Sequence, residues 1–225
     1  MKDLITIGLP SKGRLKDKAI SFFIERGHKI VQSEKERNYF GTIENEPNIK
    51  IIFLHAKEII QRLGDGTLDI GISGLDLLKE SDKNLQNKIN VQKKLDFGNA
   101  NLVVAVPNDW IDVQTIADVE EVSFDIRSKR NSRLRVATKY PNLTNDFLIS
   151  KGVTQYKLIP SLGATETYPF IGSSEIITDI TSSGKTLADN NLRVLKDGLI
   201  LSSNACLFIA KKKATKLQPF LKSFG

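Results

Sequence analysis

The fold is decided at the start of the chain by residues 4–23, LITIGLPSKGRLKDKAISFF. Residues 4–9 form a short apolar run of the kind that builds a buried strand. Beyond the loop at 10–14, apolar residues recur at helical spacing, at Leu15, Ala19, Phe22 and Phe23. The helix that they predict ends at Gly27. A strand, a glycine-containing loop and a helix in this order predict a mainly parallel sheet covered by helices.

The same alternation continues along the chain. Further strands are predicted at 49–54, 68–72, 102–106, 122–126, 134–137, 156–159, 175–180 and 206–210. Helices are predicted at 56–63 and 75–79. Three more are predicted to begin at Thr115–Asp118, which resembles a capping box, at Gly163 and at Thr186, and another is predicted to end at Lys151. The polar stretch 80–90 is expected to be a loop. The order predicts an α/β protein.

Length and strand order predict two lobes. A chain of 225 residues has room for two domains, since a typical domain has about 100–150 residues. We expect lobe I to comprise 1–97 completed by 196–225, because the last apolar strand is most simply a return to the first lobe. Lobe II is then 98–195. Two crossings between the lobes would give a hinged ligand cleft.

Composition excludes several classes of protein. With 40% hydrophobic and 26% charged residues the chain is neither disordered nor collagen-like. It has no run of about 18 apolar residues and no secretory cleavage site, so neither a membrane span nor a signal peptide is expected. One cysteine and two histidines favour no disulfide and no structural metal, and therefore a reduced, cytoplasmic location.

The net charge of +7 raises the question of a nucleic-acid partner. Five lysines and no acid lie in residues 211–225, which we interpret as a solvated tail. A second basic run at 127–135 contains no acid and no interleaved aromatic residue for base stacking. No nucleic-acid partner is expected, and a role for 127–135 near an anionic ligand remains open.

The most informative segment for function is residues 176–187, IITDITSSGKTL. A strand delivers Asp179, after which hydroxyl residues and a glycine lead into a helix, an arrangement suited to phosphate. A Walker A motif is excluded, because its first glycine would have to occupy position 179. A carboxylate before such a loop suits a phosphoribosyl group, because it can accept hydrogen bonds from the ribose hydroxyls. The alternative is a serine-rich surface turn.

Two other loops have ambiguous chemistry. Lys12 and Arg14 follow the first strand and suit a polyphosphate, although a solvated turn fits equally well. The turn at 163–166 carries Glu166 and can be functional or structural. Cys206 is expected to be a core residue rather than a nucleophile. No catalytic triad or metal-binding motif stands out.

Six motifs in order resemble the short form of ATP phosphoribosyltransferase, the first enzyme of histidine biosynthesis. They are residues 9–15 (LPSKGRL), 69–76 (DIGISGLD), 95–98 (LDFG), 136–144 (VATKYPNLT), 163–166 (GATE) and 179–187 (DITSSGKTL). The resemblance implies the fold of type II periplasmic binding proteins. It also implies transfer of the phosphoribosyl group of phosphoribosyl pyrophosphate (PRPP) to N1 of ATP, with release of pyrophosphate.

The resemblance further implies site residues. The catalytic residues would be Lys12, Arg14, Arg37, Glu166 and Asp179. PRPP would be bound by Asp179, Thr181, Ser182, Ser183, Gly184, Lys185 and Thr186. ATP would be bound by Lys12, Gly13, Arg14, Gly74 and Asp96. The cofactor would be Mg²⁺, held largely by substrate phosphates with Glu166 and Asp179 close to it.

The short form also implies partners. A homodimer is expected, together with a hetero-oligomer containing a regulatory subunit related to histidyl-tRNA synthetase, in which histidine feedback would reside. One departure from the family is His55, where an arginine is usual, since a histidine is mostly uncharged near neutral pH. The alternative functions are a binding module of the same bilobed fold without transferase activity and, less favoured, a nucleic-acid binder.

Overall fold

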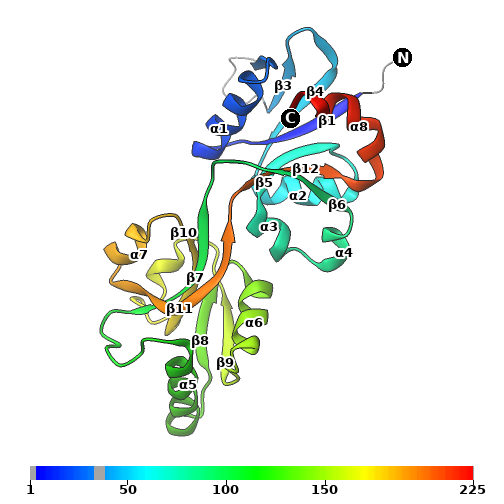
Figure 1. Cartoon of the computed structure of the whole chain (residues 1–225). Helices are drawn as coiled ribbons and strands as arrows, with labels where there is room; N and C mark the ends of the chain where they lie inside the picture. Colours follow the sequence, from blue (N-terminus) through cyan, green and yellow to red (C-terminus); the bar gives the residue numbers. More distant parts are fainter. Residues whose placement is uncertain (1–3, 33–38, 225) are drawn as a thin grey trace. The chain divides into compact units, whose positions relative to one another are not determined.

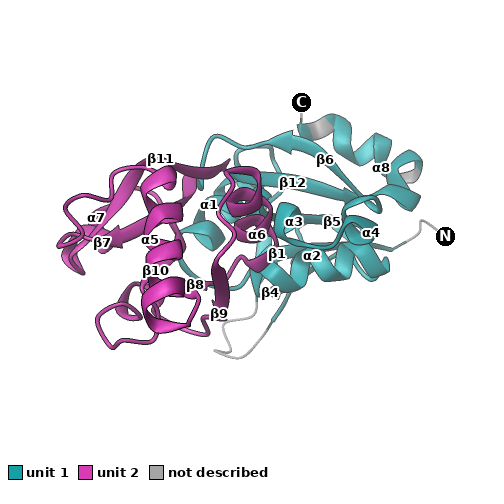
Figure 2. Cartoon of the chain, turned by 90° about the horizontal axis from the view of Figure 1, so that it is seen from below, with its two compact units in different colours: residues 1–98, 204–225 teal, residues 99–203 magenta. Residues whose placement is uncertain are grey.

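The computed structural model describes residues 4–32 and 39–224, which form two compact units. Unit 1 contains residues 1–98 and 204–225, and unit 2 contains residues 99–203 (Figure 2). The chain therefore leaves unit 1 once and returns to it once. In the described residues no helix has both the length and the apolar character needed to cross a membrane.

Unit 1 is built on a seven-stranded sheet in the order β2-β3-β4-β1-β5-β12-β6 (Figure 1). Its strands are β1 (Ile5–Pro10), β2 (Ile30–Gln32), β3 (Phe40–Ile43), β4 (Glu46–Leu54), β5 (Ile70–Gly74), β6 (Ile89–Lys94) and β12 (Ala205–Ala210). Its helices are α1 (Gly13–Ile24), α2 (Ala56–Asp65), α3 (Leu75–Glu80), α4 (Lys83–Gln86) and α8 (Ala214–Leu221).

The strand directions bring four loops of unit 1 to one edge. β1 pairs in parallel with β4 and β5. β12 runs antiparallel to both β5 and β6, so β6 has the same direction as β5. The carboxyl ends of β1, β4, β5 and β6 therefore lie on the same side of the sheet, which is where ligands bind in open α/β sheets.

Two apolar layers hold the sheet of unit 1. One joins α1 to β1 and β4 through Phe23 and Phe53, and the other joins α2 and α3 to β12 through Phe208. The carboxyl-terminal tail belongs to the first layer, since Leu217 and Phe224 are buried in it. The tail lysines are mostly exposed, as the prediction of a solvated charge run requires, at Lys211, Lys212 and Lys222. The burial of the apolar residues between them was not predicted.

Unit 2 is built on a five-stranded sheet in the order β11-β7-β10-β8-β9. Its strands are β7 (Ala100–Pro107), β8 (Leu134–Thr138), β9 (Tyr156–Pro160), β10 (Ile176–Thr181) and β11 (Leu192–Ser203). Its helices are α5 (Ile116–Arg130), α6 (Pro141–Ser150) and α7 (Lys185–Asp189), with a 3-10 turn η1 at Thr165–Thr167. β8, β9 and β10 are mutually parallel, so the three loops that follow them share one edge.

Four sequence expectations differ from the structure. Residues 122–126 belong to helix α5 and not to a strand, and the helix expected from Gly163 is only the turn η1. Strand β6 begins within the expected loop 80–90. The expected lobe boundary at 195/196 falls inside β11, whose pairing with β7 continues to Ser203, so unit 2 ends eight residues later.

Candidate functional site

Asp179 is the most buried acid at the carboxyl edge of the second sheet. It lies near the end of β10 and is only 9% exposed. Its Oδ1 accepts a hydrogen bond of 2.8 Å from the Ile180 N–H. Burial raises its pKa above the ordinary value, and the nearby Glu166 carboxylate raises it further. Lys139 and the Thr165 hydroxyl act in the opposite direction.

These pKa effects identify Asp179, Glu166, Lys139 and Thr165 as one electrostatic cluster. They come from three strands of the sheet: Asp179 lies on β10, Lys139 directly follows β8, and Thr165 and Glu166 lie in the turn η1, which follows β9. The sequence analysis named both acids but missed Lys139. The signal available was its position directly after an apolar strand that runs parallel to β10.

A buried chain of hydroxyls fixes the loop that carries Lys139. The Thr144 and Thr178 hydroxyl oxygens are 2.6 Å apart, and the Thr138 hydroxyl oxygen lies 2.6 Å from that of Thr178 and 3.1 Å from that of Thr144. The Tyr140 N–H donates to Thr138 Oγ1 at 2.9 Å. All three threonines are at most 2% exposed. Their network ties the start of α6 to β8 and β10, and it was not foreseen from the sequence.

The loop from Thr181 to Thr186 connects β10 to α7. The Gly184 N–H donates to Thr181 Oγ1 at 2.8 Å, and Gly184 itself adopts a left-handed conformation with φ of 74°. The side chains that follow Thr181 on this loop are mostly exposed, at Ser182, Ser183, Lys185 and Thr186. The loop thus presents several hydroxyls and one ammonium group to solvent beside the Asp179 cluster, which suits an anionic ligand.

In unit 1, Lys12 and Arg14 lie in the loop that follows β1. Both side chains are exposed, and neither has an ion-pair partner within residues 4–32 and 39–224. Gly13 between them has φ of 65°, a conformation that favours glycine. The Ser11 N–H donates to the Leu54 carbonyl at 2.8 Å and so fixes the loop to the end of β4.

The ends of β5 and β6 meet around Asn204. Its carbonyl accepts from the Leu75 N–H at 3.0 Å and its side-chain amide donates to the Leu95 carbonyl at 3.1 Å. Gly74 precedes Leu75, and the exposed Asp96 follows Leu95. Gly74 and Asp96 are therefore brought to the same part of the edge by one asparagine. Asp96 also lines a hollow of about 320 Å³ beside α1.

Three remaining expectations have different outcomes. His55 caps α2, since its Nδ1 accepts from the Lys57 N–H at 3.3 Å, which gives this residue a structural role. Cys206 is fully buried, and burial raises the pKa of its thiol to about 11, which disfavours the nucleophilic thiolate. Arg37 lies outside the described residues.

Comparison with known proteins gives a family. The model of the family described as HisG: ATP phosphoribosyltransferase matches residues 55–224. A protein of Brucella melitensis named ATP phosphoribosyltransferase is 45% identical over 212 residues, which cover 94% of this chain and 92% of that protein. A protein of the same name from Chelativorans sp. is 46% identical over 210 residues, covering 93% and 91%.

Solved structures give the fold. The structure described as an ATP phosphoribosyl transferase (HisG:HisZ) complex from Thermotoga maritima matches with a TM-score of 0.74 and 24% identity, covering 98% of this chain and 96% of that one. An ancestral amino-acid-binding protein, AncCDT-1, matches with a TM-score of 0.56 and 14% identity, covering 98% and 88%. At such low identities these likenesses concern architecture alone, as expected for the type II periplasmic-binding-protein fold.

Proposed function

The chain belongs to the ATP phosphoribosyltransferase family, and on that premise we infer that it transfers the phosphoribosyl group of PRPP to N1 of ATP. Pyrophosphate leaves, and the reaction opens histidine biosynthesis. The observation that carries this inference is the family match across residues 55–224, joined to relatives 45% identical over 94% of the chain. The proposed location of the reaction is the cytoplasm.

The chemistry explains why no catalytic dyad is needed. N1 of adenine is a neutral ring nitrogen with a free lone pair, so it can attack carbon 1 of the ribose without losing a proton first. The bond from that carbon to the pyrophosphate oxygen breaks, and its electron pair leaves with pyrophosphate. What needs stabilising is positive charge on the ribose and negative charge on the leaving group. Orientation of the two substrates can contribute about 7–11 kcal/mol more.

PRPP is proposed to bind at the carboxyl edge of the unit 2 sheet. The hydroxyls and backbone N–H groups of residues 181–186 would hold the 5-phosphate, and Asp179 would accept hydrogen bonds from the ribose hydroxyls. Support comes from the exposure of those hydroxyls and from the tight turn at Gly184 beside them. Lys139, which the sequence analysis did not single out, is coupled to Asp179 and would bring a positive charge to the same substrate.

ATP is proposed to bind through the carboxyl edge of the unit 1 sheet. Lys12 and Arg14 would contact its phosphates, and Gly13 would allow the loop backbone to approach them. Support comes from the exposed and unpaired state of both cations in the described part of the chain. Gly74 and Asp96 would form the second part of the site, around Asn204.

Mg²⁺ is proposed as the cofactor. Among the described residues there is no group of three or more His, Cys, Asp or Glu side chains arranged to hold a metal. That fits Mg²⁺, which usually keeps several waters and takes one or two carboxylates plus substrate phosphates. Glu166 and Asp179 are the carboxylates that would lie close to the ion. The ion would neutralise negative charge on the pyrophosphate.

We propose two assemblies: a homodimer, and a hetero-oligomer with a regulatory subunit related to histidyl-tRNA synthetase. The Thermotoga protein of the same fold is described as a HisG:HisZ complex. In the hetero-oligomer, histidine would bind the regulatory subunit. Linkage then requires histidine and PRPP to change each other's apparent affinity by the same factor.

One experiment tests the reaction directly. The chain is incubated with ATP, PRPP and Mg²⁺, with and without its regulatory subunit, while the ultraviolet absorbance of the N1-substituted adenine nucleotide is followed. We expect product that depends on both substrates, and histidine inhibition only with the subunit present. Absence of product in both mixtures would overturn the assignment, and histidine inhibition of the chain alone would overturn the proposed regulation.

A further inference from the structure

Unit 2 has a second surface at the opposite edge of its sheet from residues 181–186, the loop proposed to bind PRPP. It consists of two adjoining hollows that share Arg130, Arg135 and Glu175. Glu175 directly precedes β10, whereas the PRPP loop follows it. Six strand residues separate the two edges by roughly 20 Å. Any ligand of this surface is therefore distinct from the substrates. We refer to the two hollows together as the distal surface.

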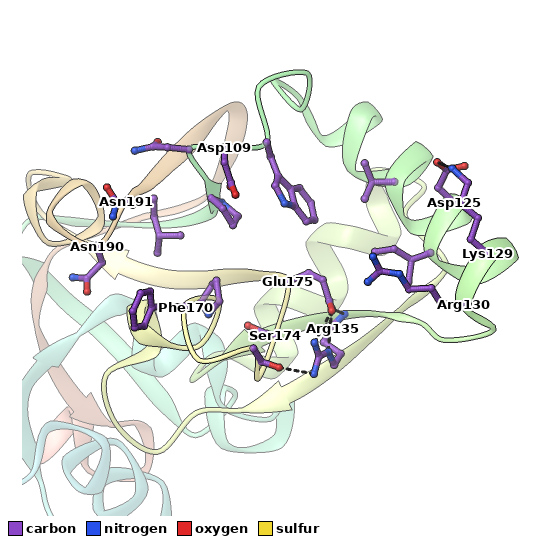
Figure 3. A pocket seen from close by; sticks show the side chains of 18 residues that line it. Asp109, Asp125, Lys129, Arg130, Arg135, Phe170, Ser174, Glu175, Asn190 and Asn191 are labelled. Atoms are coloured by element: carbon purple, nitrogen blue, oxygen red, sulfur yellow. Dashed lines mark hydrogen bonds and ion pairs between the residues drawn. The ribbon is translucent and has the colours of Figure 1, made fainter.

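The first hollow is the more apolar half of the distal surface, and we call it the apolar hollow. Its volume is about 860 Å³, and its apolar lining includes Trp110, Val122, Ile126 and Phe170, the last labelled in Figure 3. Its charged lining residues are Asp109, Asp125 and Lys129, together with the three that it shares with the second hollow. Phe170 is 89% exposed. Ile111 and Ile171, each next in sequence to a lining residue, are 75% and 62% exposed. Large exposed apolar side chains gathered around one hollow are typical of an interaction site.

The second hollow is the cationic half, with a volume of about 600 Å³. Its charged lining residues are Arg127, Arg130, Arg133, Arg135, Lys157 and a single acid, Glu175. Glu175 already forms an ion pair with Arg135, whose Nη2 and Nε donate to its carboxylate at 2.6 and 3.1 Å. The hollow therefore has four positive charges in excess.

Ordinary structural roles account for only part of this charge. The Arg127 side chain donates to the Asn131 carbonyl at 3.3 Å at the end of α5, where cations are favoured by the helix dipole. Arg130, Arg133 and Lys157 have no acidic partner among the described residues. Three uncompensated cations around one hollow repel one another, and an anionic partner relieves that repulsion.

The two halves lie along one face of helix α5. Val122, Asp125, Ile126, Lys129 and Arg130 all line the apolar hollow, at a spacing of three and four residues that puts them on one side of a helix. The face is apolar at Val122 and Ile126 and cationic at Arg130, while Lys129 is paired with Asp125 at 2.6 Å. A matching ligand must likewise carry an apolar anchor beside negative charge.

We propose that the distal surface docks an acidic, apolar-anchored surface of a protein partner, namely the regulatory subunit of the hetero-oligomer. This rests on the hetero-oligomer proposed above. A second copy of the chain is disfavoured, because a twofold contact through this face would set the excess positive charges against one another. Aromatic residues and arginine are also the types enriched at the centres of protein interfaces.

The extent of the surface favours a protein over a small ligand. The two hollows together exceed the 300–1,000 Å³ of a usual ligand pocket, and their apolar rim points outward rather than enclosing a cavity. A nucleic acid would satisfy the cationic half but would leave the exposed isoleucines uncovered. Nucleic-acid binding is therefore retained only as an outcome of the test.

The test reverses charge in the cationic half. The variant Arg130→Glu/Arg133→Glu/Lys157→Glu lowers the formal net charge from +7 to +1. The control Lys88→Glu/Lys151→Glu/Lys212→Glu makes the same change at exposed lysines elsewhere. A third variant, Phe170→Ser, removes an apolar side chain that is almost fully exposed and so spares the fold. Binding to the regulatory subunit, and separately to a DNA and an RNA duplex, is measured by sedimentation at two salt concentrations.

We expect the first and third variants to bind the subunit at least tenfold more weakly, while the control binds like the unaltered chain. Turnover of each variant without the subunit should be unchanged. Trp110 is the only tryptophan, so 5-fluorotryptophan labelling gives one ¹⁹F resonance at this surface. That resonance should shift on complex formation with the unaltered chain.

The outcomes separate the two proposals. If the unaltered chain does not bind the subunit, the hetero-oligomer itself is wrong. If the unaltered chain and all variants bind equally well and the ¹⁹F resonance stays in place, the hetero-oligomer stands and the docking surface is wrong. If the charge-reversed variant loses affinity only for a DNA or RNA duplex and not for the subunit, the distal surface is a nucleic-acid site and the proposal is overturned.

Discussion

At the scale of single residues, Asp179 combines a cost in stability with a proposed role in catalysis. Burial is the largest influence and raises its pKa, so the folded state holds the proton more tightly than the unfolded state. The contribution of Asp179 to stability is therefore full below the ordinary pKa of about 3.8 and is lost as pH rises through the folded-state pKa. At neutral pH the buried, ionised carboxylate therefore lowers the free energy of unfolding.

Replacing Asp179 by Asn removes this loss of stability, because the amide cannot ionise and its oxygen still accepts the hydrogen bond from the Ile180 N–H. We expect Asp179→Asn to have a higher melting temperature at pH 7, by roughly 2–4 °C for each kcal/mol relieved. The difference should vanish near pH 3, and transferase activity should fall on the order of 100-fold. Melting curves from pH 3 to 8 check this, and an unchanged or lower melting temperature at pH 7 would contradict it.

Thr186 gives a second prediction at this scale. Thr186→Val keeps the side-chain shape and removes one exposed hydroxyl that is proposed to donate to the 5-phosphate. A hydrogen bond to a charged group contributes about 1.5–3 kcal/mol, so PRPP affinity should fall roughly ten- to a hundredfold. Calorimetric titration measures it, with Thr42→Val on the exposed face of β3 as the control. Equal PRPP affinity in all three proteins would refute the assignment of the loop.

At the scale of elements, the turn between β10 and α7 depends on one backbone conformation. Gly184 has φ of 74°, and a Cβ added there meets no atom within 4 Å, so Gly184→Ala tests strain without a clash. We expect a loss of about 1–2 kcal/mol in the free energy of unfolding, together with weaker PRPP binding. Gly163→Ala is the matched control, because its Cβ also meets open space and its φ is not left-handed. Similar behaviour of both variants would argue against strain.

The elements also show how far sequence patterns reach. Buried strands followed by glycine loops were predicted closely, because their apolar runs are local signals. Residues 122–126 misled, since Val122, Phe124 and Ile126 alternate as in a strand. The capping box at Thr115 and Asp118 starts a helix that continues through them and leaves Phe124 52% exposed. The capping box therefore decided the secondary structure of 122–126, and the alternation of apolar residues did not. The sequence offers both signals, and the structure shows that the chain adopts the helix.

The candidate site was only partly predictable for a similar reason. Asp179, Glu166 and the loop residues stand in recognisable local motifs. Lys139 also lies in a quoted motif, residues 136–144, but its place near Asp179 follows from the pairing of β8 with β10. The hydroxyl chain through Thr138, Thr144 and Thr178 joins residues up to 40 positions apart. Such contacts depend on strand order, which short-range periodicity does not encode.

At the scale of the whole molecule, unit 2 should be an independent folding unit. It is a continuous segment with its own apolar clusters, and its two ends are neighbours because Ala100 on β7 pairs with Ser203 on β11. We expect residues 99–203 expressed alone to unfold in one cooperative transition and to be stabilised by PRPP. Circular dichroism melts with and without PRPP measure both. A segment without a cooperative transition would show that unit 2 depends on unit 1.

The route of the chain through the first sheet has a consequence for synthesis on the ribosome. β12 separates β5 from β6 in the sheet and pairs with both, yet it is translated after all of unit 2. Until residues 205–210 leave the exit tunnel, β6 has no neighbour and one side of β5 is an open edge that invites wrong pairing. The second half of the nascent polypeptide can therefore mature before the first. A chaperone that shields emerging chains would be needed most by the part that is made earliest.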